Sequence, residues 1–225
     1  AAARQPPVAL RSPPHPGARA LLQAGPRLQP PVSGLAAPSA NRFGRVSPTT
    51  AAHVQAEFGE ALTVLDGGAC EVGIESAIVD CTRAVPVLLR PGVLTHAQIE
   101  AACDERLYLP HEVEGATPKA SGTLASHYAP HATVRLMDAK ALQTSLDVLG
   151  TEAAHLAIWS RAELRTASRQ VLRRRMPAEA ARAARELFAV LREFDAQGAR
   201  LIWIEQPPDE PEWAGVRDRL RRAAA

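Results

Sequence analysis

The alternation of apolar runs with helical patterns over residues 132–225 constrains the fold more than any other feature of this sequence. A helical pattern begins after Pro177, and Gly198 stands where a helix C-cap is expected. Strands that alternate with helices favour a small parallel α/β sheet, so we predict a separate domain here. The strand-like runs are 133–137, 155–159 and 200–204.

Periodicity disappears between residues 104 and 131. This stretch carries Gly115, Pro118 and Gly122 among charged residues. A long connection without periodicity is uncommon inside a compact domain and tends to be functional, so we predict a linker or lid. No G-x-G-x-x-G follows the first strand of the segment after it, and we assign that segment no dinucleotide.

Residues 1–103 mix strand and helix patterns and are expected to form an α/β unit of their own. A helical pattern runs from His15 to Leu22, and Thr95 is the expected cap of a short helix over 96–100. Asp66-Gly67-Gly68 marks a turn. The predicted strands are 8–11, 62–65, 74–79 and 85–89.

The segment from Ala37 to Thr50 is rich in hydroxyl, amide and guanidinium groups beside glycine and proline. Such side chains and the nearby backbone N–H groups can surround a phosphate or a carboxylate, which indicates an anion-binding loop. The run Ser47-Pro48-Thr49-Thr50 leads into a predicted helix over 51–58, whose first-turn amides could bind an anion. The simpler alternative is a helix cap with a preset first turn.

Polar groups also stand at the ends of other predicted strands. The motifs Gly73-Ile74-Glu75-Ser76 and Leu88-Leu89-Arg90-Pro91-Gly92 adjoin apolar runs, and Arg11-Ser12-Pro13-Pro14-His15-Pro16 lies upstream. Because α/β sheets usually place their ligands at strand ends, we expect these motifs to meet at one site.

These spaced motifs, with Ser121-Gly122-Thr123-Leu124-Ala125-Ser126-His127-Tyr128-Ala129-Pro130 after them, resemble the two-domain threonylcarbamoyl-AMP synthases of the YrdC-like family. The resemblance implies that residues 1–103 form the C-terminal part of a YrdC-like mixed α/β catalytic domain. It implies that 104–131 is a linker or lid, and that 132–225 is a small Rossmann-like parallel α/β domain. Such enzymes are nucleotidyltransferases that join L-threonine, bicarbonate and ATP into threonylcarbamoyl-AMP and release pyrophosphate.

The resemblance also implies roles for individual residues. Positioning and charge neutralisation would supply most of the chemistry, so no catalytic side chain and no metal ligand is assigned. Two positions depart from the family pattern, since Ala77 and Phe43 stand where many relatives have threonine and serine. The implied ATP-binding residues are Arg11, Asn41, Ser47, Thr49, Arg90 and Tyr128, and the implied threonine-binding residues are His15, Ser39 and Ser76.

The family comparison further implies substrates and partners. ATP would enter as a substrate with Mg²⁺, no cofactor would be tightly bound, and tRNA or downstream tRNA-modification proteins would be partners. Members of the family begin with a further stretch that bears a Lys/Arg-rich motif, and nothing here matches it. We therefore expect that the catalytic domain lacks its N-terminal part. Unpaired sheet edges would then make residues 1–225 fold poorly or self-associate. We expect residues 1–225 to be inactive alone.

Composition excludes several other classes of protein. With 46% hydrophobic and 22% charged residues and a net charge of +2, the chain is ordinary for a soluble protein, and we expect a cytoplasmic location. No apolar run is long enough for a membrane helix. The three cysteines lack zinc-ligand spacing and are expected to be buried or half-buried thiols, and Arg173-Arg174-Arg175 is expected to be a solvated strand or turn.

Other functions stay open at this point. The chain could be a non-catalytic RNA- or nucleotide-binding module, or a scaffold for a partner in tRNA modification. Single residues have alternatives too. His15 could satisfy a backbone group, Tyr128 could be buried at a domain interface, and Glu75 could be a base or the salt-bridge partner of Arg90.

Overall fold

The computed structural model describes residues 8–115, 118, 120–124 and 126–225. Its centre is a four-stranded sheet in which every neighbouring pair of strands is parallel. This confirms the predicted α/β class with a parallel sheet. The strand order is β3 (Thr133–Met137), β6 (Leu201–Glu205), β4 (Leu156–Ser160) and β5 (Leu172–Arg175), and β5 contains the solvated arginine run.

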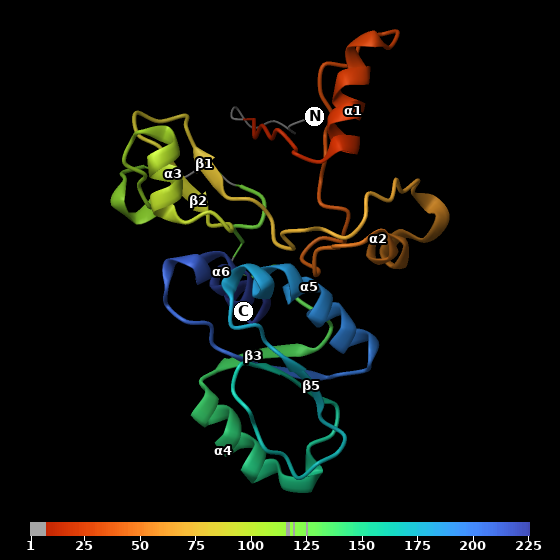
Figure 1. Ribbon diagram of the computed structural model, residues 1–225, viewed down its shortest axis with the longest axis vertical. Coiled ribbons are helices and arrows are strands. Elements are labelled where there is room, and N and C mark those ends of the chain that lie inside the picture. The colour runs from red at the N-terminus through yellow and green to blue at the C-terminus, as the bar shows by residue number, and fades with distance from the viewer. Residues whose placement is uncertain (1–7, 116–117, 119, 125) are drawn as a thin grey trace.

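Helices cover both faces of this sheet (Figure 1). Helices α5 (Ala180–Ala196) and α6 (Ala214–Ala223) pack on one face, and α4 (Ala139–Leu149) packs on the other. Side chains alternate along β4, so that Trp159 faces α5 and α6 whereas Ile158 faces α4. The apolar repeat in 180–194 is therefore the buried stripe of α5, as expected from its helical spacing.

The first part of the chain is less regular. Helix α1 (Pro16–Ala24) and helix α2 (Ala51–Phe58) contain no buried residue. Strands β1 (Ile78–Asp80) and β2 (Val87–Arg90) form an antiparallel pair beside α3 (His96–Cys103), which starts with the predicted Thr95 cap. The short 3-10 helices of the described chain are η1 (Gly25–Arg27), η2 (Gly59–Ala61), η3 (Pro110–Glu112), η4 (Gly150–Glu152) and η5 (Pro211–Trp213).

Two predicted strands are wrong. Residues 8–11 and 62–65 form no strand in the structure, and their apolar side chains point outward, with Leu10 92% and Leu65 75% exposed. A strand needs a neighbour for its backbone N–H and C=O groups, and no described strand runs beside either segment. The strand predicted over 74–79 is likewise limited to its end, because pairing begins only at Ile78.

The described residues of the segment 104–131 contact the rest of the chain through backbone and side-chain hydrogen bonds, among them Arg90 to the Ser121 carbonyl and the His127 amide to the Arg222 carbonyl. Isolated bridges join Tyr108 to Val87 and Ala129 to Arg45. Lys119, which the sequence places in this segment, lies outside the described residues. In the part of the chain that the structure describes, no helix combines the length and apolarity needed to cross a membrane.

The prediction of buried thiols is wrong. Cys70, Cys81 and Cys103 are all exposed and free. Cys70 lies in a loop, Cys81 follows the end of β1, and Cys103 is the last residue of α3. Because α3 buries only Ile99, its end offers little apolar surface to cover a thiol.

Candidate anion-binding site

Arg90 ends β2 with a buried guanidinium, only 6% of the residue being exposed. Its Nε and Nη2 donate to the carbonyl of Ser76 at 3.1 and 2.9 Å, and its Nη1 donates to the carbonyl of Ser121 at 2.7 Å. Burial lowers the pKa of Arg90 from its ordinary value. Neutral carbonyls do not balance a buried charge, so this cation is placed to attract an anion.

Tyr128 lies beside Arg90 in a strained conformation. It is 1% exposed, its φ is 62°, and its hydroxyl has no hydrogen-bond partner among the described residues. A Cβ on Gly122, whose φ is +70°, would collide with that hydroxyl and would lie 2.9 Å from Nη1 of Arg90. Burial raises the pKa of Tyr128, so the phenol is neutral and can donate. The hydroxyl and the guanidinium therefore share one small space next to Gly122.

Glu75 connects this space to the hydroxyl-rich loop, residues 37–50. The Ser47 hydroxyl donates to its Oε1 at 2.5 Å, and Arg219 Nε donates to its Oε2 at 2.9 Å. Burial alone raises the pKa of Glu75, but the Arg219 charge and the two hydrogen bonds outweigh it, so the pKa lies below its usual value. The carboxylate is thus held ionised. The alternative that Glu75 pairs with Arg90 is not what the structure shows, because Glu75 forms its salt bridge with Arg219.

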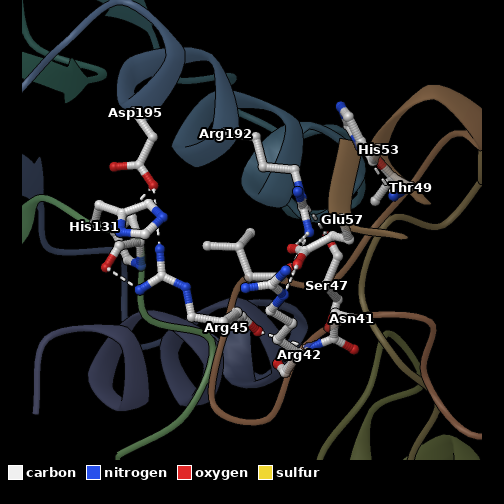
Figure 2. Close-up of polar contacts among 12 residues, drawn as sticks. Asn41, Arg42, Arg45, Ser47, Thr49, His53, Glu57, His131, Arg192 and Asp195 are labelled. Atoms are coloured by element: carbon white, nitrogen blue, oxygen red, sulfur yellow. Dashed lines mark hydrogen bonds and ion pairs between the residues drawn. The ribbon is translucent and has the colours of Figure 1, made fainter. Parts of the chain in front are cut away.

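The start of α2 is capped by its own side chains. The Thr50 hydroxyl accepts from the His53 amide at 3.2 Å, and the Thr49 amide donates to His53 Nδ1 at 3.1 Å (Figure 2). Burial lowers the pKa of His53, and the nearby charge of Arg192 lowers it further. This turn is therefore a helix cap, as the simpler alternative from the sequence has it. The His53 amide of the first turn is already bonded to the Thr50 hydroxyl.

Asn41 holds the turn that precedes this cap. Its Nδ2 donates to the carbonyls of Arg42 and Arg45 at 3.1 and 2.9 Å. Its Oδ1 is buried and has no partner among the described residues. An unpaired buried carbonyl is costly, so this oxygen is available to a donor that a ligand would bring.

A cavity of about 860 Å³ lies between the turn at 42–46, α2 and α5. The charges in it are paired across the two parts of the chain: Arg192 donates to Glu57 at 2.8 Å, and Arg45 lies 3.9 Å from Asp195 (Figure 2). Its charged and imidazole side chains are Arg42, Arg45, His53, Glu57, His131, Arg192, Glu193 and Asp195.

Three of the implied site residues, Arg11, His15 and Ser39, stay apart from this centre in the described chain and are exposed. Ser76 is also exposed, but it follows Glu75 and its carbonyl accepts from Arg90. His15 caps α1: its Nδ1 accepts from the Gly17 amide at 3.2 Å, and its Nε2 lies 3.3 Å from the Gly67 carbonyl. The backbone-satisfying alternative for His15 therefore describes its contacts. Ser47, Arg90 and Tyr128 do come together, around Glu75.

Sequence reasoning missed Arg219, which binds Glu75 from α6. A signal was present. The buried residues Val216, Arg219, Leu220 and Ala223 follow helical spacing, so an arginine stands within the apolar stripe. Among the described residues, no group of three or more His, Cys, Asp or Glu side chains could hold a metal ion.

The fold and this centre define a mixed α/β protein with a buried cation, Arg90, where two parts of the chain meet. Two family models match the chain. The model described as "Threonylcarbamoyl-AMP synthase, C-terminal domain" matches residues 94–225, and one described as "Telomere recombination" matches residues 1–92. The chain belongs to the threonylcarbamoyl-AMP synthase family.

Curated relatives agree with this assignment. The threonylcarbamoyl-AMP synthase of Bacillus subtilis is 32% identical over 96% of this chain and 63% of its own length. The enzyme of the same name from Schizosaccharomyces pombe is 30% identical over 96% of this chain and 57% of its own length. The chain thus spans less than two thirds of the length of these relatives.

Solved structures show the same fold. A crystal structure of Pyrococcus abyssi Sua5 complexed with L-threonine has a TM-score of 0.69 and 30% identity, and the match covers 83% of this chain and 56% of that one. A structure of the same protein with an adjacent histidine and tyrosine replaced by alanine has a TM-score of 0.70, 28% identity and the same coverage.

Proposed function

We propose that the protein to which this chain belongs forms threonylcarbamoyl-AMP from L-threonine, bicarbonate and ATP, as a nucleotidyltransferase. The amine of threonine would condense with bicarbonate to a carbamate with loss of water. A carboxylate oxygen of this carbamate would then attack the α-phosphorus of ATP, and the bond to the pyrophosphate leaving group would break. ATP would enter as a substrate together with Mg²⁺. The product would supply the threonylcarbamoyl group for tRNA modification, with tRNA or downstream modification proteins as partners.

The observation that carries this proposal is the buried cation of Arg90, which carbonyls hold and no described carboxylate pairs. Two of its guanidinium N–H groups remain beyond those three hydrogen bonds. A phosphate of ATP would receive them, because charge-assisted bonds to phosphate are strong and directional. Ser47, Thr49 and Asn41 would complete the nucleotide side, with Arg11 brought in from the first segment.

The linker would close the site over the nucleotide. Tyr128 and Gly122 already lie against Arg90, and the Tyr128 hydroxyl is free to donate. Excluding water is useful here, because water hydrolyses both a carbamate and a mixed anhydride. Support comes from the Pyrococcus abyssi structure with a changed histidine and tyrosine, since His127-Tyr128 is the one His-Tyr pair in this sequence.

The threonine side is proposed to involve His15, Ser39 and Ser76. The support is the L-threonine complex of Pyrococcus abyssi Sua5, a protein of the same fold. These three side chains are exposed in the present structure, so they are accessible to a ligand. The domain limits proposed for this arrangement are 1–103, 104–131 and 132–225, with a Rossmann-like final domain.

The test is product formation by the complete product of the gene that encodes residues 1–225. We expect pyrophosphate release only when threonine, bicarbonate and ATP are all present. We expect R90Q to lower kcat/KM about 100-fold, the usual effect of removing a donor to developing charge. The control is R106Q, because Arg106 lies in an exposed pair with Glu112.

Two results would count against the proposal. Pyrophosphate release that needs no threonine would exclude this reaction, and equal loss in R90Q and R106Q would remove the assigned role of Arg90. Residues 1–225 in isolation are expected to show negligible ATP/pyrophosphate exchange, since they span less than two thirds of the relatives.

A further inference from the structure

Arg219 lies on α6, near the end of the chain, yet its guanidinium contacts the strand-end motifs of the first part. The residue is 0% exposed. Its Nε donates to Glu75 Oε2 and its Nη2 donates to the Glu75 carbonyl, each at 2.9 Å. Its Nη1 donates to the Pro91 carbonyl at 2.9 Å and to Asp218 Oδ2 at 2.7 Å. One side chain therefore joins two segments that are separate in sequence.

Close packing also holds the two strand-end motifs, residues 73–76 and 88–92, against helices α5 and α6. A Cβ on Gly215 of α6 would collide with the Gly92 carbonyl, and a Cβ on Gly73 would collide with the backbone of α5 at Ala184. Ile74, between these points, belongs to the core cluster of α5 and α6. The backbones of both motifs thus approach the two helices as closely as glycine allows.

The atoms that Arg219 holds are next to those that position Arg90. Arg219 binds the Glu75 carbonyl, and Arg90 binds the following carbonyl, that of Ser76. Arg219 also binds the Pro91 carbonyl, one residue beyond Arg90 itself. A shift of either segment would therefore move the guanidinium that is proposed to meet the nucleotide phosphate.

We propose that Arg219 is a positioning residue of this site, through which α6 sets the place of Arg90 and the orientation of Glu75 and Ser47. This inference rests on the proposed function for its effect on catalysis, but its geometric part does not. The planar fork of arginine is needed because its donors reach two carboxylates and two carbonyls in different directions. A lysine ammonium keeps the charge but lacks this fixed fork.

The experiment compares R219K and R219Q in the complete gene product with R217Q as the matched control. Arg217 lies on the same helix and also donates to backbone carbonyls, but to those of Pro208 and Glu210, away from the two motifs. Amide hydrogen exchange is followed at 73–77 and at the non-proline residues of 90–93. We expect exchange there about tenfold faster in both Arg219 variants and unchanged in R217Q.

Activity is measured on the same samples and corrected for the folded fraction. We expect kcat/KM to fall about 100-fold in R219Q and almost as far in R219K, as a small misplacement of a clamp can cause. Full rescue by lysine in both assays would overturn the proposal, because charge alone would then suffice. An equal effect of R217Q would overturn it as well.

If the wild-type protein forms no product, the proposed function fails. The exchange data still decide whether Arg219 positions the two motifs. Faster exchange confined to 73–77 and 90–93 in R219K then supports the positioning role. Exchange like that of the wild type refutes it.

Discussion

Arg192 on α5 donates a hydrogen bond of 2.8 Å to Glu57 on α2, across 135 positions of sequence. The same guanidinium donates to the carbonyls of Val46 and Ser47. Because α2 has no buried residue, polar contacts of this kind hold it against the C-terminal helices. The hydroxyl-rich loop is therefore fixed from the far end of the sequence.

We expect R192A to lower the free energy of unfolding by about 2 kcal/mol, since it leaves a largely buried carboxylate and two carbonyls without their donor. The measurement is denaturant unfolding. The control on the same helix is R182A, whose pair with Glu179 is exposed and should contribute below about 0.5 kcal/mol. Equal losses in the two variants would show that the Arg192 contacts add nothing specific.

The C-terminal part of the fold could be predicted because its signal is local. The mostly apolar runs 133–137, 156–160 and 201–205 form three strands of the parallel sheet, and the last two of them are largely buried. The apolar stripe of α5 recurs at helical spacing. Strand pairing over 8–11 and 62–65 could not be decided in this way. An apolar run indicates that a segment can form a strand. The strand forms only if another backbone lies beside it to accept and donate the hydrogen bonds.

The centre of the site was predictable only in part. Arg90 and Tyr128 belong to motifs, and the structure brings them together beside Gly122. The contact of Glu75 with Arg219 spans 144 positions and depends on how α6 is rotated about its axis. The rotation of α6 is set by its packing. The motif around Glu75 therefore could not predict that Arg219 is its partner.

A substitution at Gly122 tests how closely this residue approaches the Tyr128 hydroxyl and the Arg90 guanidinium. We expect G122A to destabilise the protein by about 1 kcal/mol for its positive φ, and further for the collision with the Tyr128 hydroxyl. G198A is the matched control, because Gly198 has a φ of +78° and nothing within 4 Å of its added Cβ. The measurement is the free energy of unfolding of both variants.

The collision itself is tested by a second substitution. In G122A/Y128F the hydroxyl is absent, so part of the loss in G122A should be recovered. If G122A and G198A lose the same free energy, or if Y128F rescues nothing, Tyr128 does not occupy the space beside Gly122.

Acid should destabilise the fold through two histidines. Burial is the main cause that lowers the pKa of His53 and of His127. A group with a lowered pKa stays neutral in the folded chain while the unfolded chain takes up a proton below about pH 6.5. Stability is therefore full above that pH and is lost as the pH falls through the window below it.

The measurement is the free energy of unfolding between pH 7.5 and 5.5. We expect H127Q to flatten this dependence, and H111Q, at an exposed position, to leave it unchanged. Glu75 adds no slope in this window because its pKa lies below the usual carboxyl value of about 4.3. A slope in H127Q as steep as in the wild type would exclude His127 as a source.

Glu205 is the last residue of β6 and lies at the carboxyl ends of the parallel strands, where such folds usually bind ligands. Its Oε2 accepts from the amides of Arg161 and Ala162 at 2.7 and 2.8 Å, and its Oε1 accepts from Arg161 Nη2 at 2.6 Å. This carboxylate occupies an anion cradle made by the donors of Arg161 and Ala162. We expect E205A to lose about 2 kcal/mol, because it leaves these donors unpaired.

The opened cradle of E205A should then accept an added anion. We expect sulfate to raise the Tm of E205A more than chloride does at equal ionic strength, and more than sulfate raises the Tm of the wild type. E193A is the control, since Glu193 pairs with Arg174 in a half-exposed position. A sulfate effect no larger in E205A than in E193A would mean that the two amides form no cradle once the carboxylate is gone.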